Sequence, residues 1–433
     1  MNNGMLKIVL SGLVLSSLMG CDEDDSSVDV PELSSKALLG EQLYSDKNLS
    51  LNRTQSCATC HNLEHGFIDD RANDASRDTG NGLVASAGSL GDNGTSIGDR
   101  NAPTAAYAFK SPEFHSGTRQ RSVVLQRFGA YEGFMGGQFW DGRETDLKGQ
   151  AAGPPTNPDE MAMPNKAAVV DRLLEDASYV QAFEYIYGGD IFDDVESAYA
   201  AMAESIGEFE KSDVFAPFDS KYDRSLLNST DENYFEIDNF SQVETGRSLF
   251  FSSDFTCAAC HQLQPLPIKN EVFTSFEFHN IGVPENTALR LINNAVGPDN
   301  GLFKNSAANI ESEKGKFKVP TLRNIAVTAP YMHNGIFNEL ETVIRFYQHA
   351  NERAVNLDNG AAITAVNNPE TRTAWGDAEV NENISHDLLK GSITLSEGRE
   401  KALICFLISL TDARYEHLLD QAKVTECFKN AIQ

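Results

Sequence analysis

The chain has 433 residues, with 63 acidic and 35 basic side chains and a formal net charge of −28 at pH 7. This length is sufficient for two domains that each bury a hydrophobic core. The charge excludes nucleic acid as a partner, because binding to phosphates needs a basic surface, and it is compatible both with attraction of a basic partner protein and with ordinary solubility.

The N-terminus carries the features of an export signal. Lys7 precedes a short apolar run that ends in Leu-Met-Gly-Cys at 18–21, similar to a bacterial lipoprotein signal. We predict that 1–20 is a signal peptide, that Cys21 becomes the lipidated first residue, and that 21–36 is an acidic tether. The run is short for a membrane span, and an uncleaved anchor is the alternative. The predicted location is therefore periplasmic, with a lipid anchor in a bacterial membrane.

The pentapeptide Cys-x-x-Cys-His occurs twice, about two hundred residues apart. The residues concerned are Cys57, Cys60, His61, Cys257, Cys260 and His261. In this motif both thiols add to the vinyl groups of a c-type haem, and the histidine binds the iron. A zinc site or a redox-active cysteine pair is the alternative, but neither requires a histidine directly after the second cysteine in both copies. The sequence thus predicts two covalently bound c-type haems.

A similar segment precedes each motif, at 39–46 and 245–252. Each contains a glycine, an apolar residue three positions later and an aromatic residue next, which predicts a helix before each haem loop. The fold class is therefore predicted to be all-α (mainly helical), with two cytochrome c-like haem domains in tandem and long irregular loops. Their predicted extents are 37–211 and 239–433.

Other segments complete this prediction. The stretch 166–211 has helical periodicity, with one apolar side formed by Val170, Leu173, Leu174, Ala182, Phe183 and Ile186. The polar segment 212–238 is expected to connect the two domains, and 66–100 to be an irregular surface loop. Residues 395–419 are predicted to form another amphipathic helical stretch. Cys405 and Cys427 remain as a pair that is either bridged, as an oxidising compartment allows, or kept as buried thiols.

Several motifs then occur in a characteristic order. They are Arg-Asn-Ala-Pro-Thr at 100–104, Gln-Phe-Trp-Asp-Gly-Arg at 138–143, Gln-Ala-Ala-Gly-Pro at 150–154, Asn-Pro-Asp-Glu-Met at 157–161, Val-Pro-Thr-Leu-Arg-Asn at 319–324 and Thr-Ala-Pro-Tyr-Met-His-Asn-Gly at 328–335. Together with the haem motifs, they make the chain resemble the bacterial dihaem cytochrome c peroxidase and MauG superfamily, from about Leu38 to Leu419. The resemblance implies an enzyme that acts on hydrogen peroxide.

The resemblance also assigns roles to residues. His61 would bind the peroxidatic iron and His261 the electron-transfer iron. Splitting peroxide needs an acid/base group beside an open coordination site, and Glu160 matches that distal glutamate. The other matching positions are Gln150 and Pro154, which would line the distal pocket, and Trp140, which would relay electrons between the haems.

A calcium ion is implied as well. In the family it lies between the domains, bound by an asparagine side chain and two backbone carbonyls with waters. The matching positions are Asn101, Thr328 and Pro330, and such hard oxygen ligands fit calcium rather than a transition metal.

Two departures favour the MauG-like branch. Where the peroxidases have a blocking histidine before the Arg-Asn-x-Pro-Thr run, this chain has Asn93, so an open first haem is predicted; His115 is the weaker alternative for that ligand. Where the peroxidases have methionine on the second haem, this chain has Tyr347, as MauG-like members do. An anionic oxygen ligand should lower the reduction potential. His349, Met332 or water is the alternative ligand, and His279 is expected to be structural.

Three functions follow. The first, and the one we favour, is a peroxidase that takes electrons from a small exported cytochrome c or cupredoxin. The second is MauG-like oxidation of a partner protein by peroxide. The third is a dihaem electron carrier, against which Glu160, Gln150 and Trp140 argue.

Overall fold

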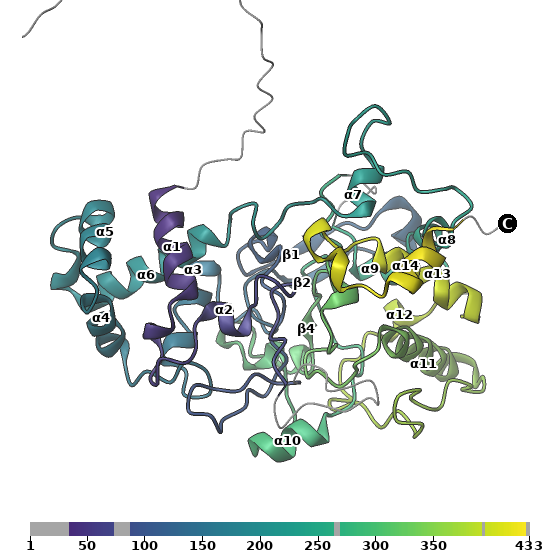
Figure 1. Cartoon of the computed structure of the whole chain (residues 1–433). Helices are drawn as coiled ribbons and strands as arrows, with labels where there is room; N and C mark the ends of the chain where they lie inside the picture. Colours follow the sequence, from purple (N-terminus) through teal and green to yellow (C-terminus); the bar gives the residue numbers. More distant parts are fainter. Residues whose placement is uncertain (1–33, 73–86, 264–268, 392–394, 430–433) are drawn as a thin grey trace, which may run out of the picture. The chain divides into compact units, whose positions relative to one another are not determined.

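The computed structural model describes residues 34–72, 87–263, 269–391 and 395–429, and helices are its main regular element (Figure 1). The predicted signal peptide and Cys21 lie outside the described residues. The described helices are α1 (Ser35–Ser45), α2 (Cys57–Cys60), α3 (Leu147–Ala151), α4 (Lys166–Leu174), α5 (Ala177–Tyr187), α6 (Val195–Phe209), α7 (Lys221–Ser225), α8 (Gln242–Phe250), α9 (Cys257–Cys260), α10 (Thr287–Asn293), α11 (Leu340–Asn359), α12 (His386–Leu389), α13 (Glu397–Ile408) and α14 (Gln421–Phe428). Because α1 begins at Ser35, it includes the last two residues of the predicted tether.

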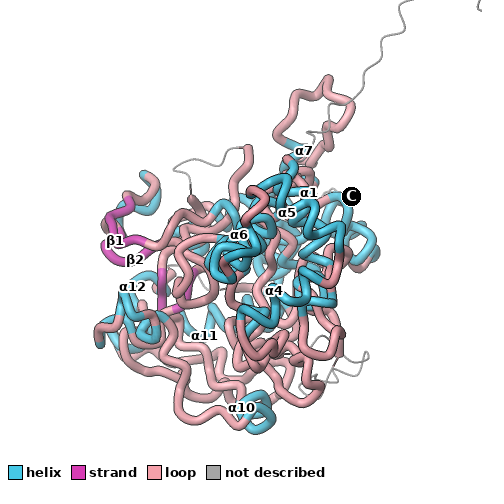
Figure 2. Tube along the Cα trace, turned by 90° about the vertical axis from the view of Figure 1, so that its left-hand side faces the viewer, coloured by secondary structure: helices cyan, strands magenta, loops and turns pink. Residues whose placement is uncertain are grey.

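Strands are few and short in the described part of the chain (Figure 2). β1 (His115–Arg119) and β2 (Tyr131–Met135) form an antiparallel pair, as do β3 (Phe278–His279) and β4 (Phe317–Lys318). A mainly helical fold with long irregular loops is therefore confirmed, with these two small sheets added to it. No helix among the described residues is long and apolar enough to cross a membrane.

The helices predicted before the two haem motifs are present as α1 and α8, and each crosses a later helix at a glycine. A Cβ atom on Gly40 would lie 1.9 Å from the backbone oxygen of Ser205 in α6. A Cβ atom on Gly246 would lie 1.8 Å from the backbone oxygen of Ala402 in α13. Only a residue without a Cβ atom lets the helix backbones approach so closely. The glycine repeated in the sequence thus marks the same helix crossing twice.

Two hydrophobic clusters surround these crossings. The first contains residues of α1, α4, α5 and α6, and the second contains residues of α8, α11, α13 and α14. Tyr44 packs on Phe209 in the first, with ring centroids 5.5 Å apart, and Phe250 packs on Phe406 in the second, at 5.1 Å. The C-terminal Tyr415 nevertheless belongs to the first cluster, and all described residues lie in one compact unit. The domain boundaries therefore stay predictions.

Replacing Gly246 by Ala should lower the free energy of unfolding by about 1–3 kcal/mol, because the added methyl group forces α8 and α13 apart. Denaturant unfolding of the haem-loaded protein, followed by circular dichroism, measures the loss. The matched control is Gly398→Ala in α13, where a Cβ atom meets no other atom within 4 Å; it should be neutral or stabilising by up to about 1 kcal/mol. Equal stability of Gly246→Ala and the wild type would contradict this account of the crossing.

The two predicted helical stretches are helical in large part, although in 395–419 the α-helix ends at Ile408 and a short 3-10 helix follows at 413–418. The segment 166–211 forms α4, α5 and α6, and Val170, Leu173 and Phe183 are buried as predicted. Leu174 was placed wrongly on the apolar side, since 45% of it is exposed at the end of α4. In α13, residues 402–408 are all buried, so its amphipathic character was also predicted wrongly. A helical segment that is apolar on every side, as 402–408 is, lies within a core.

Cys405 in α13 and Cys427 in α14 form a disulfide, with an S–S distance of 2.02 Å. Of the two states that the sequence left open, the structure has the bridged one. The bond joins residues 22 positions apart and ties α14 to the core helix α13.

Two segments that were predicted to be surface or connecting segments contribute to the interior. Within 212–238 lies α7, whose Asp223 accepts a hydrogen bond of 2.8 Å from Nη2 of the fully buried Arg323. Within the described part of 66–100, Phe67, Asp92 and Ile97 are buried, so this segment is not an irregular surface loop throughout. These buried parts place side chains beside the haem motifs.

Candidate functional site

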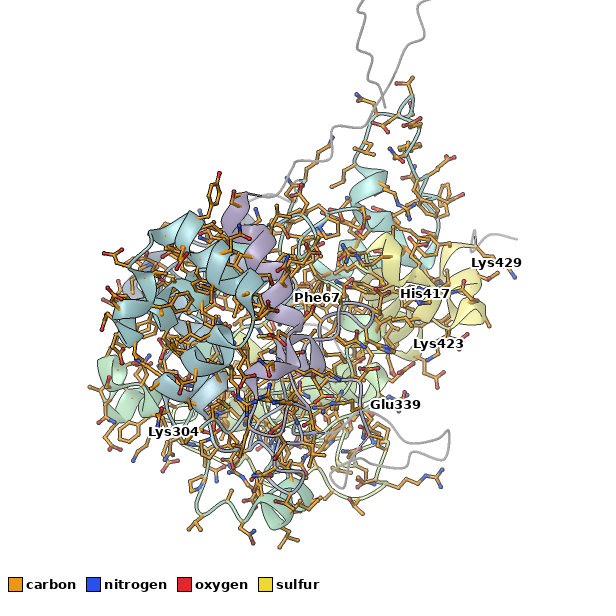
Figure 3. The ribbon with its side chains drawn as sticks, turned by 60° about the vertical axis from the view of Figure 1, so that its left-hand side comes forward. Phe67, Lys304, Glu339, His417, Lys423 and Lys429 are labelled. Carbon is orange, nitrogen blue, oxygen red and sulfur yellow. A yellow bond between two sulfur atoms is a disulfide. The ribbon has the colours of Figure 1, made fainter. Side chains whose placement is uncertain are left out.

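Each Cys-x-x-Cys-His motif forms one helical turn, α2 or α9, with its histidine directly after it. Nδ1 of His61 donates to the carbonyl of Phe67 at 3.2 Å, and Nδ1 of His261 donates to the carbonyl of Phe273 at 3.1 Å. Figure 3 shows Phe67 in the interior near α1, and 1% of the residue is exposed. Because a carbonyl oxygen only accepts, both histidines carry the proton on Nδ1 and present the lone pair of Nε2 to a metal.

The loops that supply these carbonyls have the same construction. Phe67 has φ 57° and Phe273 has φ 51°, a region that residues with a Cβ atom rarely adopt. The residue before each phenylalanine accepts a hydrogen bond from a threonine hydroxyl, from Thr104 at 2.6 Å and from Thr321 at 2.7 Å. Both threonines belong to the Pro-Thr pairs noted in the sequence. The two loops are thus held by equivalent contacts.

The donor chemistry of the motifs fits haem. Burial lowers the pKa of both histidines, to about 4 for His261, so the neutral imidazole that binds a metal is present at neutral pH. All four motif cysteines are outside any disulfide. Two thiols followed by a neutral imidazole are what covalent attachment of a c-type haem requires at each motif.

A cavity of about 330 Å³ lies against the second motif. Cys257, Cys260 and His261 line it. Apolar side chains make up much of the remaining wall, among them Phe250, Ile344, Leu388, Leu403 and Leu407. An apolar cavity beside the attachment thiols and the histidine is suited to a porphyrin.

Tyr347 lies on α11 and lines the same cavity. Burial raises the pKa of its hydroxyl well above the usual range, and the nearby sulfurs of Cys260 and Cys257 raise it further. Tyr347 is therefore within electrostatic reach of both attachment sulfurs. This position is compatible with the predicted iron ligand, which stays a prediction.

The alternative ligands on the second site differ in their surroundings. His349 makes contacts outside the cavity, because its Nδ1 donates to the carbonyl of Ala365 at 2.9 Å and its ring stacks on Trp375 with centroids 5.7 Å apart. Met332 lines the cavity and stays an alternative. His279, expected to be structural, also lines the cavity and forms a hydrogen bond of 2.8 Å to Glu277.

Glu160 lies close to the first motif. Its Oε2 is enclosed and has no hydrogen-bond partner among the described residues, although another part of the residue reaches the surface. Burial raises the pKa of Glu160, and the positive charge of Arg143 opposes that rise. Burial likewise raises the pKa of Cys57 and of Cys60, and the Glu160 carboxylate contributes to both increases. The carboxyl group is thus within electrostatic reach of both attachment sulfurs.

Gln150 and Pro154 belong to the turns that lead to Glu160. Gln150 lies in α3, and its carbonyl accepts a hydrogen bond of 3.0 Å from the backbone N–H of Gly153. The carbonyl of Pro154 accepts from the N–H of Asn157 at 3.2 Å. These bonds fold 147–160 into consecutive turns, so the three predicted distal residues lie on one short, folded segment.

Trp140 lies on the wall of the same cavity beside the second motif. Its indole N–H donates to the carbonyl of Asn101 at 2.8 Å. Asn101 stands three positions before Thr104, which supports the loop that contacts His61. Asn101 and Thr104 line the same cavity as the indole. The cavity wall thus includes a segment that supports the first motif, and the position of Trp140 is compatible with the predicted relay.

The predicted calcium ligands Asn101, Thr328 and Pro330 all line this cavity. No group of three or more His, Cys, Asp or Glu side chains placed to bind a metal occurs in the described ranges. The predicted ligands are of a different kind, an amide oxygen and two backbone carbonyls. Their position on one cavity is compatible with a calcium site, and calcium binding stays a prediction.

Asn93 stands where the peroxidases have their blocking histidine. Its side chain is exposed and donates to the hydroxyl of Ser96 at 2.7 Å. The neighbouring Asp92 donates its backbone N–H to the carbonyl of Glu160 at 2.7 Å, so this loop packs against the distal turn. His115 is exposed on β1 and donates from Nδ1 to the carbonyl of Glu113 at 2.7 Å, where it has a local role in the hairpin.

Sequence reasoning missed the two phenylalanine carbonyls and Arg143. Phe67 follows its histidine by six positions and Phe273 by twelve, so no common spacing indicated them. Arg143 was noted only as part of a motif. Lys148 is closer in sequence to the proposed distal residues than Arg143, so proximity along the chain did not single out Arg143.

The comparisons with known proteins agree with this geometry. Residues 34–231 match the family model described as di-haem cytochrome c peroxidase. The chain is 41% identical to the methylamine utilization protein MauG of Paracoccus denitrificans over 393 residues, 90% of this chain and 92% of that protein. It is 30% identical to the cytochrome c551 peroxidase of Nitrosomonas europaea over 338 residues, 77% of this chain and 79% of that protein.

A solved structure is similar over the same length. The crystal structure of the diheme peroxidase BthA from Burkholderia thailandensis E264 has a TM-score of 0.70 and 25% sequence identity, and covers 92% of this chain and 91% of that one. The likeness thus includes both haem motifs and the segments between them. The chain belongs to the dihaem cytochrome c peroxidase and MauG family of haem-dependent oxidoreductases.

Proposed function

We propose that the protein reduces hydrogen peroxide at the first haem site, with electrons that pass through the second site and Trp140. The observation that carries this proposal is the enclosed Oε2 of Glu160, which has no hydrogen-bond partner among the described residues. An unpaired buried carboxyl oxygen costs free energy. Beside Cys57 and Cys60, that cost is explained if the oxygen exchanges a proton with a substrate.

Haem iron, when bound, supplies the coordination site for peroxide and the electrons for its reduction. His61 and His261 would each hold one haem from the proximal side. Glu160 accepts a proton from one peroxide oxygen and returns it to the other, which leaves as water. Reduction of one peroxide to two waters consumes two electrons and two protons. Gln150 and Pro154 would line the pocket in which this transfer occurs.

A second candidate function is peroxide-dependent oxidation of a partner protein. Tyr347 on the cavity beside the second motif favours it, as does the 41% identity to a MauG protein. In the first function the partner is a small exported cytochrome c or cupredoxin, and in the second it is the oxidised protein. For both functions we propose a periplasmic location, with Cys21 as the lipid attachment point.

Stopped-flow absorption of the as-isolated ferric protein, mixed with hydrogen peroxide, tests the proposed function. We expect a fast spectral change without prior reduction, because Asn93 provides no imidazole to block the first site. A reduced small cytochrome c or cupredoxin should then be oxidised in a 2:1 ratio to peroxide. If peroxide instead produces a long-lived oxidised species that these donors do not reduce, the result would favour the second function.

The proposed function would be wrong if the ferric protein with both haems attached left peroxide unchanged. A protein loaded with haem at only one motif does not test it, so haem content is measured first by absorption of the pyridine complex. If the protein reacts with peroxide only after prior reduction, the first haem site is not open in the ferric protein, and the inference from Asn93 is wrong.

A further inference from the structure

Arg143 is fixed beside the distal turn by a buried carboxylate. Its Nη1 lies 3.0 Å and 3.1 Å from the two carboxylate oxygens of Asp141, whose side chain is 3% exposed. Asp141 is itself held by Arg100, whose Nη1 donates to it at 2.7 Å. Arg100 is paired in turn with Asp299, at 2.6 Å and 2.9 Å. Although 43% of the Arg143 side chain is exposed, its guanidinium is therefore anchored to a buried ionic network.

An aromatic ring adds a second constraint. The guanidinium carbon of Arg143 lies 3.6 Å from the ring centroid of Phe139, an arrangement in which cation and ring attract each other. Phe139 has φ 63°, and its ring edge lies 3.7 Å from the Cβ position of Gly153. Gly153 stands between Gln150 and Pro154. The stack of Arg143 on Phe139 thus lies against the segment of the distal residues.

The charges that act on Glu160 come from three parts of the chain. Burial raises the pKa of Glu160, whereas the positive charge of Arg143, in the turn after Trp140, lowers it and so favours the carboxylate. The negative charges of Asp159 and Asp99 raise the pKa. On the loop packed against this turn, Asp92 accepts hydrogen bonds from Ser50 and Thr54. Cys57 and Cys60 lose their titrating thiols once haem is attached.

We propose that Arg143 is a positioning residue that keeps Glu160 in its ionised, proton-accepting form, and so sets the lower pH limit of the peroxide reaction. The proposal rests on the proposed function, because it gives Arg143 no role without proton transfer at Glu160. Asp141 and Phe139 hold the guanidinium in place. Its positive charge there stabilises the ionised carboxylate of Glu160, which the burial of Oε2 disfavours. Arg143 acts through Glu160 and takes no proton itself, since a guanidinium stays protonated at any physiological pH.

The test is the pH profile of the second-order rate constant for peroxide, measured by stopped flow on haem-loaded protein. In Arg143→Gln the acid limb should move to higher pH, so that the rate on that limb falls by roughly 3- to 10-fold, whereas the alkaline plateau stays the same. Arg143→Lys retains the charge and should restore most of the wild-type profile. Asp159→Asn removes an opposing charge and should move the limb to lower pH.

Arg53→Gln is the matched control. Arg53 is a similarly exposed arginine that forms a two-bond ion pair with Glu175, at 2.8 Å and 3.0 Å, and its removal changes the net charge equally. Its profile should coincide with that of the wild type.

Two outcomes separate this proposal from the proposed function. If Glu160→Gln stops the reaction but the profiles of Arg143→Gln and the wild type coincide, the role of Arg143 is wrong and the proposed function stands. If Glu160→Gln reacts with peroxide like the wild type, the proton-transfer role that the proposed function gives to Glu160 is wrong. Should Arg143→Gln not retain haem, Arg143→Met, which also removes the charge but keeps an unbranched side chain against Phe139, is measured in its place, and an unmoved acid limb in that variant overturns the proposal.

Discussion

Replacing Glu160 by Gln should lower the rate of peroxide-driven oxidation by about 10²- to 10⁴-fold, the usual contribution of a general acid–base group. Glutamine has nearly the shape of glutamate but neither accepts nor releases a proton in this pH range. Oε2 is enclosed and has no partner among the described residues. The carboxyl group also has a side-chain hydrogen bond with Asn157, which the amide oxygen of glutamine can accept, so the substitution should disturb few contacts. Both haems should remain attached, since the cysteines and histidines of the motifs are unchanged. Steady-state oxidation of a reduced electron donor by peroxide measures the loss.

Glu339→Gln is the control for this prediction. Glu339 precedes α11, and Figure 3 shows it apart from Phe67. Burial raises the pKa of Glu339, as it does for Glu160, so the two variants remove similar carboxyl groups from different places. Oxidation by Glu339→Gln should stay within about twofold of the wild type. Wild-type turnover in Glu160→Gln would remove Glu160 from the mechanism.

The elements that sequence predicted best are those whose function requires a fixed spacing. The thiols and the histidine of a c-type haem motif must be close in sequence, so both motifs were identified from the sequence, although the helical turns α2 and α9 that they form were not. The demand of the haem motif thus acts within five consecutive residues. Gly40 and Gly246 were noted because they recur before both motifs, and the sequence did not indicate the distant helices that they contact.

Other features depend on contacts between distant segments, and the sequence did not indicate them. The carbonyls of Phe67 and Phe273 occupy equivalent places although the loops before them differ in length. Leu174 has the right periodicity but lies where α4 ends, beyond the reach of the core. Tertiary packing decided each of these cases.

The predicted roles of Tyr347 and Glu160 have different kinds of support. Resemblance to the family suggested both residues, and the structure places each within electrostatic reach of one pair of attachment sulfurs. For Glu160 an enclosed oxygen without a partner adds an independent reason for a function. For Tyr347 the reason is its position on the cavity, which Met332 shares. A substitution at Tyr347 is therefore needed to decide which of these two residues binds the iron of the second haem.

Replacing Tyr347 by Phe should change the absorption spectrum of the second haem and raise its reduction potential. A phenolate oxygen stabilises the ferric state, and its loss should shift the potential by on the order of 0.1 V, within the roughly 0.8 V that axial ligands span. Burial raises the pKa of the free Tyr347 hydroxyl well above its usual range. The phenolate therefore depends on a bound cation, and titration of the haem-free protein should show no tyrosinate near neutral pH.

Tyr415→Phe is the control variant, because it distinguishes loss of an iron ligand from loss of any buried tyrosine hydroxyl. Tyr415 is also a buried tyrosine, with a hydroxyl that donates to the carbonyl of Leu63 at 2.7 Å, but it belongs to the first hydrophobic cluster. Its loss should cost about 1 kcal/mol of stability and leave the potential of the second haem unchanged. A spectroelectrochemical titration of both variants gives the two potentials. If Tyr347→Phe keeps the spectrum and potential of the wild type, tyrosine is not the ligand, and Met332 on the same cavity wall becomes the residue to replace next.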